Sequence, residues 1–303
     1  MTGKPVVPLA IVSPVRDEAR YVRNTLDAML AQTVQPQEWL FVDDGSQDDT
    51  PKILSSYASM NPWIRVVRRD DRGFRQLGSG VIAAFNYGRE RLSNPDYQYI
   101  AKLDGDMSFP PRYLEIMLAR LENDAQLAAV SGKVFRPEGG GLVEEFIIDE
   151  MVAGQFKLYK RSAFDAIGGF PQTILWDGID IHKCRIKGFR TLSFNDANAR
   201  LIHHRLMGSS DANVFKGRAR LGRGIWFMGY HPLYAVASGV FRMREKPYVI
   251  GGLIMIFSYF GAALRHDPQF EDREFIRDLR KWQLGRLRSL PRSLFGTDSS
   301  GYA

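Results

Sequence analysis

Residues 99–107 read Tyr-Ile-Ala-Lys-Leu-Asp-Gly-Asp-Met, an apolar run that ends on two aspartates separated by one glycine. The run predicts a buried strand, with Asp104 and Asp106 standing just past its end. Burying carboxylates without partners is costly, so packing alone does not explain this pair. Two such groups can hold a hard divalent cation that bridges the phosphates of a nucleotide. The segment is therefore the centre of a candidate site.

The preceding residues alternate between strand-like and helix-like patterns. The expected order is strand 6–12, helix 22–30, strand 39–42, helix 53–57, strand 64–67 and helix 82–92. Such alternation predicts an α/β fold with a mostly parallel, Rossmann-like sheet and flanking helices. Ligands of these sheets bind beyond the carboxyl ends of the strands, where the acidic segments of this chain lie.

The residues that follow the central segment are less regular. We expect a strand at 130–135, a loop at 136–141, a strand and turn over 154–166, and a helix at 179–187. No internal repeat or low-complexity linker is visible. We place a domain boundary near residue 210, between a catalytic domain of residues 1–210 and a helical region of residues 211–303.

Composition is that of a globular protein: 303 residues, 45% hydrophobic and 25% charged, with one cysteine. This excludes a disordered chain, a collagen-like repeat and a disulfide framework, and Cys184 fits a reducing compartment. The first apolar run meets Pro14 without a small-residue cleavage site, so no signal peptide is expected.

The net charge of +7 is unevenly distributed. Residues 183–303 contain 21 Lys and Arg against 9 Asp and Glu, whereas the first 182 residues contain 20 and 25. The basic half interleaves its charges with long apolar runs rather than with stacking aromatic residues. Nucleic acid is therefore not an expected partner.

Two uncharged apolar stretches, 225–241 and 248–264, lie in the basic half. A helix needs about 17–25 apolar residues to span a bilayer, so each stretch is at the short end. His231-Pro232 interrupts the first, and the segment 242–247 between them is basic. The pattern favours an apolar and basic region attached to a membrane surface, peripheral or re-entrant. Core helices or a homodimer interface are the alternative.

A second acidic segment, Asp43-Asp44-Gly45-Ser46-Gln47-Asp48-Asp49, follows the strand at 39–42. Four aspartates exceed what a helix cap requires. A carboxylate here can accept the N–H of a pyrimidine base, which uracil and thymine present and cytosine does not. Residues 13–18, at the end of the first strand, supply a second wall for such a base.

These motifs together resemble the family 2 glycosyltransferases, which have the GT-A fold. The resemblance runs through SPVRDEARYVRNTLDAMLAQTVQPQEWLFVDDGSQDDT (13–50), DGD (104–106), GQFKLYKRSAFDAIGGF (154–170) and WDGIDIHKCRIKGFRT (176–191). It implies an inverting transferase that moves a sugar from a nucleoside diphosphate donor, a UDP- or dTDP-sugar, to an acceptor hydroxyl. It also implies a divalent metal, Mg or Mn.

The resemblance also assigns roles by position. Pro14, Val15 and Asp17 would line the base and ribose pocket, Asp44 would read the pyrimidine, and Asp71 or Arg72 would close over the nucleoside. Asp104 would contact ribose or metal, and Asp106 would ligate the metal directly.

The catalytic base is the harder assignment. Inversion requires a carboxylate that takes the acceptor proton, and the family places it in a Glu-Asp pair before a helix. Here the pair is broken by glycine in Trp176-Asp177-Gly178-Ile179-Asp180. Asp177 is our choice and Asp180 the reserve, with Trp176 suited to stacking on the acceptor sugar.

Two late groups complete the predicted site. His203 or His204 would serve as a further metal ligand. Arg220 and Arg223, in the basic segment KGRARLGRG, would offset charge on the leaving diphosphate.

Three other functions compete. Residues 78–83 (GSGVIA) fit a dinucleotide fingerprint but do not follow a strand directly. A sugar nucleotidyltransferase shares the fold type but lacks the segment at 176–180. A non-catalytic carbohydrate-binding or scaffold protein would explain the broken acidic pair. We expect instead a transferase at the cytoplasmic face of the cell membrane, acting on a lipid-linked saccharide in surface polysaccharide synthesis.

Overall fold

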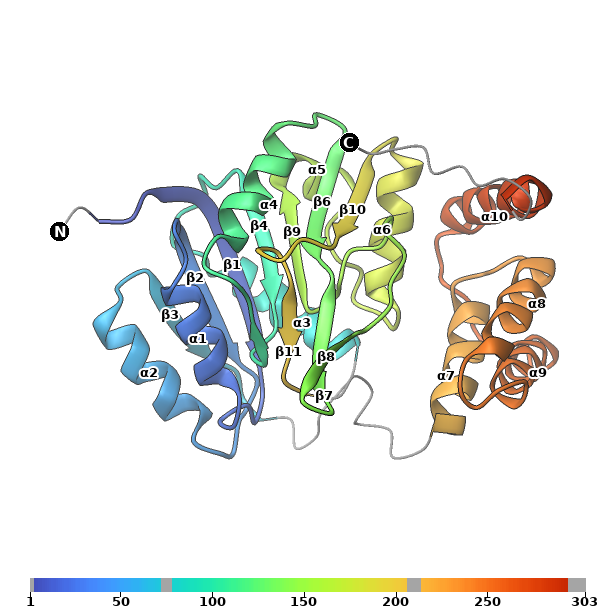
Figure 1. Ribbon diagram of the computed structural model, residues 1–303, viewed down its shortest axis with the longest axis horizontal. Coiled ribbons are helices and arrows are strands. Elements are labelled where there is room, and N and C mark those ends of the chain that lie inside the picture. The colour runs from blue at the N-terminus through green and yellow to red at the C-terminus, as the bar shows by residue number, and fades with distance from the viewer. Residues whose placement is uncertain (1–2, 72–77, 206–213, 294–303) are drawn as a thin grey trace. The chain divides into compact units, whose positions relative to one another are not determined.

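The computed structural model describes residues 3–71, 78–205 and 214–293. It divides the chain into two compact units, residues 1–207 and 208–303 (Figure 1). The sequence places a boundary at residue 210, three residues from this division. Residues 1–207 contain 26 Lys and Arg and 26 Asp and Glu, whereas residues 208–303 contain 15 and 8. All of the net charge of +7 therefore belongs to the C-terminal unit.

The N-terminal unit is built on a seven-stranded sheet of order β10-β6-β9-β4-β1-β2-β3. Its strands are β1 (Val6–Val15), β2 (Gln35–Asp43), β3 (Ile64–Arg68), β4 (Tyr99–Leu103), β6 (Leu127–Gly132), β9 (Phe156–Lys160) and β10 (Arg190–Phe194). All neighbouring pairs are parallel except those of β9, which is antiparallel to β4 and to β6. The predicted α/β fold with a mostly parallel sheet is confirmed.

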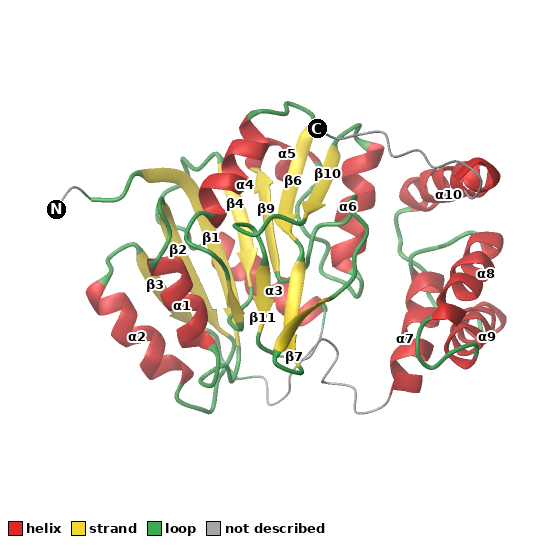
Figure 2. Cartoon of the chain, in the orientation of Figure 1, coloured by secondary structure: helices red, strands yellow, loops and turns green. Residues whose placement is uncertain are grey.

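Helices cover both faces of this sheet (Figure 2). They are α1 (Val22–Leu30), α2 (Thr50–Met60), α3 (Ser79–Arg89), α4 (Tyr113–Glu122), α5 (Arg161–Ala166) and α6 (Trp176–Ile186). Side chains of β1 alternate between the faces: Leu9 and Ile11 pack with α1, α2 and α4, whereas Ala10 and Val12 pack with α3. This alternation places the end of β1 between two filled cores.

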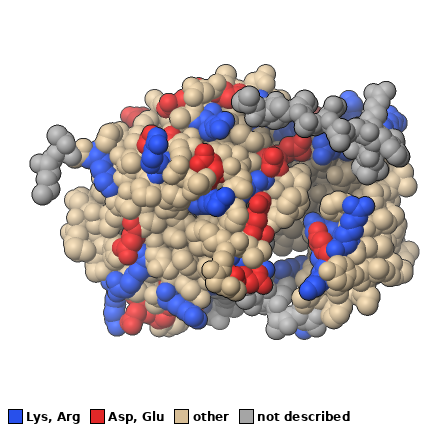
Figure 3. Space-filling model, viewed as in Figure 1, with Lys and Arg blue, Asp and Glu red and all other residues tan. Residues whose placement is uncertain are grey.

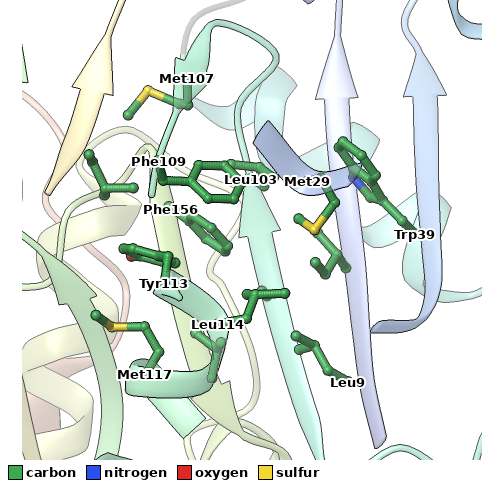
Figure 4. Packing of buried hydrophobic residues seen from close by; sticks show 14 of the residues in the cluster. Leu9, Met29, Trp39, Leu103, Met107, Phe109, Tyr113, Leu114, Met117 and Phe156 are labelled. Atoms are coloured by element: carbon green, nitrogen blue, oxygen red, sulfur yellow. The ribbon is translucent and has the colours of Figure 1, made fainter. Parts of the chain in front are cut away.

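The core under the first acidic segment is aromatic (Figure 4). The rings of Phe109 and Tyr113 both pack on Phe156, with centroids 5.3 and 4.9 Å away. Met107 directly follows Asp106 and is fully buried beside them. The turn that carries the aspartates is therefore anchored by the packing of the residues after it.

A second sheet of order β5-β11-β7-β8 lies in the same unit. Its strands are β5 (Met107–Ser108), β7 (Val134–Glu138), β8 (Gly141–Glu144) and β11 (Leu201–His203). The expectation of one strand at 130–135 is wrong, because the chain changes sheets there: β6 ends at Gly132, where a side chain would collide with the Ala199 carbonyl. The predicted loop at 136–141 is the end of a hairpin between β7 and β8.

The C-terminal unit is helical: α7 (Val214–Phe227), α8 (Pro232–Phe241), the 3-10 turn η1 (Arg242–Arg244), α9 (Ile250–Leu264) and α10 (Arg273–Ser293). The apolar stretch 225–241 is divided between α7 and α8, and α8 begins at Pro232. Among the described helices, none combines the length and the apolar character needed to cross a membrane.

Glycines bring the helices of this unit into close contact. A side chain at Gly222 of α7 would collide with the Met255 carbonyl of α9, and Gly252 of α9 similarly faces the Gly239 carbonyl of α8. Tyr259 of α9 donates a hydrogen bond of 2.6 Å to the Tyr230 carbonyl. One face of α9 therefore packs against α7 and α8.

Candidate functional site

Three loops meet at the carboxyl edge of the parallel strands. The end of β1 pairs with the end of β2, Val15 opposite Asp43, and the Asp44 N–H donates to the Val15 carbonyl at 2.9 Å. A side chain at Gly105 would lie 2.9 Å from Val15 Cγ1. The segments 13–18, 43–50 and 104–106 therefore touch, with Val15 at their common point.

The first two loops are locked together by hydrogen bonds. Asp17 has a positive φ of 55°. Its N–H donates to Ser46 Oγ at 3.0 Å, and its Oδ1 accepts from the Gln47 N–H at 2.8 Å. Asp17 thus shapes the wall predicted for the nucleoside, next to Pro14 at the end of β1.

Asp44 and Asp71 lie side by side around Arg16. One guanidinium nitrogen of Arg16 donates to the Asp44 carbonyl at 3.0 Å, and another pairs with Asp71 Oδ1 at 2.9 Å. The Asp44 carboxylate is held by Arg69 at 2.8 Å, and Gly45 leaves the space in which Asp71 sits. Arg72 lies outside the described residues.

Asp104 is held by a buried lysine. Lys102 Nζ forms a hydrogen bond with Asp104 and donates to the Gly154 carbonyl at 2.8 Å, while the Asp104 N–H donates to the Gln155 carbonyl at 2.8 Å. Strand β9 therefore begins directly beside the aspartate turn. This contact links the predicted donor side of the site to the residues around Gly154.

Asp106 is buried and only half satisfied. Its Oδ2 lies 3.5 Å from His203 Nε2 and 3.4 Å from Arg205 Nε. Its Oδ1 is buried and accepts no hydrogen bond from the described residues. An unpaired buried carboxylate oxygen is a strained arrangement for a purely structural residue, and it fits a cation ligand.

The two histidines have different surroundings. His203 closes β11 opposite Met107 and faces Asp106 and Glu145, with Nδ1 3.3 Å from Glu145 Oε2. His204 instead places Nε2 2.9 Å from Ser108 Oγ and stacks on Tyr21. Of the two predicted ligands, His203 is the one whose ring faces the carboxylates.

Burial and the neighbouring charges have opposite effects on the pKa of His203. Burial lowers the pKa of His203, but hydrogen bonds and charge interactions with Asp106 and Glu145 outweigh it and raise this pKa to about 9. Burial raises the pKa of Asp106, and His203, Arg205 and Lys102 outweigh that effect to lower it. The contacts with Asp106 and Glu145 thus favour the protonated form of the His203 ring.

The donor set fits a divalent cation bound together with a phosphate ligand. The described residues contain no group of three or more His, Cys, Asp and Glu side chains already arranged around one point. Asp106 Oδ1 is nevertheless unpaired, and the Glu145 contact orients the His203 ring as carboxylates orient histidine ligands at metal centres. Mg²⁺ sites commonly use one or two carboxylates and complete their coordination with substrate phosphates.

Asp177 lies on the other side of Gly154. It stands in the first turn of α6, partly exposed, and a side chain at Gly154 would lie 3.2 Å from Asp177 Oδ2. The chain of contacts Asp104, Lys102, Gly154, Asp177 therefore joins the aspartate turn to the predicted base.

Asp180 is unsuited to the catalytic role held in reserve for it. It is fully buried, paired with the equally buried Lys157 at 2.7 Å, and accepts a hydrogen bond from the Tyr159 hydroxyl at 2.7 Å. Burial raises its pKa, with Lys157 and Tyr159 offsetting only part of the effect. Lys157 also donates to the Asp177 carbonyl at 2.7 Å, so the buried pair of Lys157 and Asp180 joins β9 to the first turn of α6.

Trp176 does not offer the stacking surface predicted for an acceptor. Its side chain is buried, its ring lies 4.9 Å from Phe170, and the ammonium groups of Lys102 and Lys157 lie 5.2 and 5.0 Å from its centroid. Both lysines therefore gain a cation–π contact in the core.

Arg220 and Arg223 lie on α7, in the C-terminal unit. On the same helix, Arg218 pairs with Glu245 at 2.8 Å. A role for Arg220 and Arg223 at the diphosphate stays a prediction.

Several residues of the site carry no signal in the sequence pattern. Arg16 stands within a quoted motif, but its partner Asp71 is far along the chain. Arg205 pairs with Glu18, and Glu145 contacts His203. The sequence does indicate some buried ion pairs, because lysines such as Lys102 and Lys157 stand in apolar strands, where a buried charge needs a partner.

Comparison with known proteins finds a family match within the N-terminal unit. The sequence profile described as "Glycosyl transferase family 2" matches residues 10–169, more than half of the chain. The chain is 26% identical over 180 residues to "Hyaluronan synthase" of Pasteurella multocida, a match covering 55% of this chain and 18% of that protein. It therefore spans about a fifth of the length of this relative.

Solved structures share the fold. A mannosyltransferase, PcManGT from Pyrobaculum calidifontis in complex with GDP-Man and Mn2+, superposes with TM-score 0.52 and 16% identity, covering 97% of this chain and 84% of that chain. TarS 1-349 of S. aureus in complex with UDP gives TM-score 0.54 and 13% identity, with coverages of 94% and 86%. With the profile match over residues 10–169 and this GT-A-like fold, the chain belongs to glycosyltransferase family 2.

Proposed function

We propose that this glycosyltransferase is a metal-dependent inverting enzyme that moves a sugar from a UDP- or dTDP-sugar to an acceptor hydroxyl. The observation that carries the proposal is the meeting of three groups at one sheet edge: the Asp44 loop, the half-satisfied Asp106 and the partly exposed Asp177. A nucleoside, a metal-bound diphosphate and an acceptor need neighbouring sites in that order.

The nucleoside would lie against Asp44, Asp71 and the wall formed by Pro14, Val15 and Asp17. Arg16 fixes the Asp44 and Asp71 loops relative to one another. The UDP complex of the structurally similar TarS supports a uridine ligand, whereas the GDP-Man complex of PcManGT shows that this fold also accepts a purine. Asp44 is what favours a pyrimidine here, because a carboxylate accepts the N–H that uracil and thymine present.

Asp106 and His203 would hold the metal, with Asp104 next to them. When bound, the cation supplies Lewis-acid stabilisation of the diphosphate leaving group. Glu145 orients the His203 ring, and Lys102 holds Asp104 and the Gly154 carbonyl.

Asp177 would accept the proton of the acceptor hydroxyl. As the acceptor oxygen bonds to the anomeric carbon from the face opposite the diphosphate, the bond from that carbon to the diphosphate oxygen breaks, which inverts the configuration. The bonding pair leaves with the diphosphate and the proton stays on Asp177. Lys157 and Asp180 fix the first turn of α6, which positions this carboxylate.

The acceptor would be a lipid-linked saccharide of a surface polysaccharide pathway. Similarity to a relative named "Hyaluronan synthase" supports a saccharide acceptor. The lipid carrier is argued from the apolar and basic C-terminal unit, which suits a substrate at the cytoplasmic face of the membrane.

Donor hydrolysis tests the proposal. The wild-type protein should release UDP or dTDP slowly from its donor with Mg²⁺ or Mn²⁺, water taking the acceptor's place. Asp177→Asn should slow release by about 10²–10⁴-fold, the usual contribution of a general base. Asp165→Asn is the matched control, because Asp165 is an exposed acid of α5, outside the three loops of the site, and pairs with Arg89 and Arg161.

Thermal shifts with UDP, dTDP and GDP, with and without Mn²⁺, separate the alternatives, since ligands that favour the folded state stabilise it. Stabilisation by a pyrimidine nucleotide and metal without donor turnover would indicate the non-catalytic carbohydrate-binding protein. Absence of any metal-dependent nucleotide binding would overturn the enzyme proposal.

A further inference from the structure

Helix α9 carries an exposed apolar stripe. Its 15 residues, IGGLIMIFSYFGAAL, include no charged side chain. Five large residues are exposed at helical spacing: Ile250, Leu253, Phe257, Phe260 and Leu264. Phe257 is 71% and Leu264 81% exposed. Positions three, four and seven apart share one face of a helix, so these side chains form a continuous stripe.

Among the described residues, the C-terminal unit packs mainly on the other side of α9, although Leu253 and Phe260 of the stripe are each only 38% exposed. The buried residues of α9 lie on the other side of the helix: Gly251, Gly252, Met255, Tyr259 and Ala262. Those positions face α7 and α8, where the glycine contacts lie. A soluble surface helix normally presents polar residues opposite its buried face, and α9 does not.

The stripe continues over the connection between α8 and α9. Val240 and Phe241 end α8, and Tyr248 and Val249 precede α9; all four are more than half exposed. Isolated exposed apolar side chains are common, but a contiguous patch of this kind marks an interaction surface. We name these four residues and the α9 stripe the apolar face.

Cations border the apolar face at both ends. Arg244 and Lys246 are exposed in the connection, and Arg265 is exposed just after α9. Glu245 is the only acidic residue in the sequence between 214 and 264, and it pairs with Arg218 at 2.8 Å and with Arg242 at 3.0 Å. Just beyond α9, Asp267 pairs with Arg265 at 2.8 Å. Figure 3 shows largely uncharged surface over α8 and α9, with its charged side chains gathered in one place.

We propose that the apolar face inserts into the surface layer of a bilayer that contains anionic lipids, with Arg244 and Lys246 at the head groups. An α9 of this length extends about 22 Å, which is shorter than a bilayer core of about 30 Å. The helix would therefore lie in the plane of the membrane. This inference does not depend on the proposed reaction, because it rests on the C-terminal unit alone.

A second copy of the chain is the competing occupant. A dimer interface buries apolar side chains equally well, but isologous pairing through this face would bring its cationic border close to the same border of the other copy. Like charges brought together oppose association, whereas anionic head groups complement them. The charges therefore favour the membrane.

Vesicle sedimentation of the full chain tests the proposal. Wild-type protein should pellet with vesicles of equal amounts of phosphatidylcholine and phosphatidylglycerol. The double variant Phe257→Ser/Leu264→Ser should bind at least about tenfold more weakly, because two large apolar side chains no longer leave water. Met60→Ser/Val6→Ser is the matched control: these apolar side chains of the N-terminal unit are 69% and 61% exposed, and binding should be unchanged.

The cationic border is tested separately. Arg244→Ser and Lys246→Ser should each weaken binding to the anionic vesicles about fivefold and leave binding to pure phosphatidylcholine unaltered. Retention of vesicle binding by Phe257→Ser/Leu264→Ser would overturn the proposal. So would a wild-type protein that ignores vesicles and instead forms a dimer, by light scattering, which this variant abolishes.

Discussion

Two buried ionic clusters of the N-terminal unit use similar residues in opposite ways. In the Asp106 cluster, a carboxylate with His203, Glu145 and Arg205 around it keeps one oxygen unpaired. In the Asp180 cluster, both carboxylate oxygens are bonded, to Lys157 and Tyr159. Satisfied buried groups stabilise a conformation, whereas an unsatisfied one is ready to bind a ligand. The difference separates a structural cluster from a candidate binding site.

Two buried histidines, His203 near Asp106 and His182 near Asp180 on α6, also differ in their surroundings. His203 and His182 are both buried, and burial lowers the pKa of each. Carboxylates outweigh this effect at His203, whose pKa rises to about 9, whereas Arg185 adds to it at His182, whose pKa falls to about 3. Burial alone therefore does not determine whether a histidine is charged.

The largest effect on stability is expected from Asp180→Ala. The change leaves the Lys157 ammonium buried without its counterion, and we expect the free energy of unfolding in urea to fall by about 3–5 kcal/mol. Lys157→Met/Asp180→Leu should recover most of this loss, because apolar residues replace the whole pair. A loss below about 1 kcal/mol for the single variant would show that the pair is not structural.

Asp106→Asn should reduce activity strongly and stability only slightly. Activity should fall by about 10²–10³-fold, as when a charge-stabilising group of a transition state is removed, and thermal stabilisation by Mn²⁺ with nucleotide should disappear. The free energy of unfolding without metal should fall by less than about 2 kcal/mol, because His203 keeps Glu145 and Arg205 keeps Glu18 as partners when the Asp106 charge is removed. A loss as large as that of Asp180→Ala would erase the distinction between the clusters.

Glu145→Gln sharpens the account of the Asp106 cluster. Outer-shell partners of metal ligands typically contribute about 10- to 100-fold to metal affinity, so Mn²⁺ with UDP should bind more weakly by that factor. Titration calorimetry on the metal-free protein measures it. Glu144→Gln is the neighbouring exposed control and should bind as the wild type does.

The smallest predicted effect concerns pH. The pKa of His182 is about 3 in the folded protein and near 6.5 when unfolded, so the unfolded chain binds the extra proton and stability falls as the pH drops below 6.5. Between pH 7 and 5.5 this loss is about 1 kcal/mol. His182→Gln should lose that much less over the same interval in urea titrations. An equal pH dependence in both proteins would contradict the assignment.

The sequence predicts what depends on local pattern. Helix 22–30 and strand 99–103 have the predicted bounds, and the aspartates stand at strand ends because apolar periodicity stops there. The change of sheet after Gly132 was not predictable, because an apolar run continues through it while the obstacle, the Ala199 carbonyl, comes from a distant segment.

Partners of charges show the same limit. The position of Asp104 and Asp106 at a strand end followed from the local pattern. The buried ion pair of Asp180 did not, because Lys157 lies 23 residues earlier on another strand. The sequence predicted Trp176 as a stacking surface, whereas its ring packs against Phe170 in an aromatic core that the local pattern does not reveal. Periodicity predicts which face of an element a residue occupies, but it does not predict which charged residue from a distant segment lies next to it.

The pairing of β11 with β5 has a consequence for biosynthesis. Asp106 and His203 are 97 positions apart, and the short strand that brings them together is made from the last described residues of the N-terminal unit. At about 5–20 residues per second, a ribosome needs roughly 5–20 s to travel between them. During that interval the emerging chain displays its acidic turn without the histidine. A nascent chain therefore brings Asp106 and His203 together only when its N-terminal unit is nearly finished.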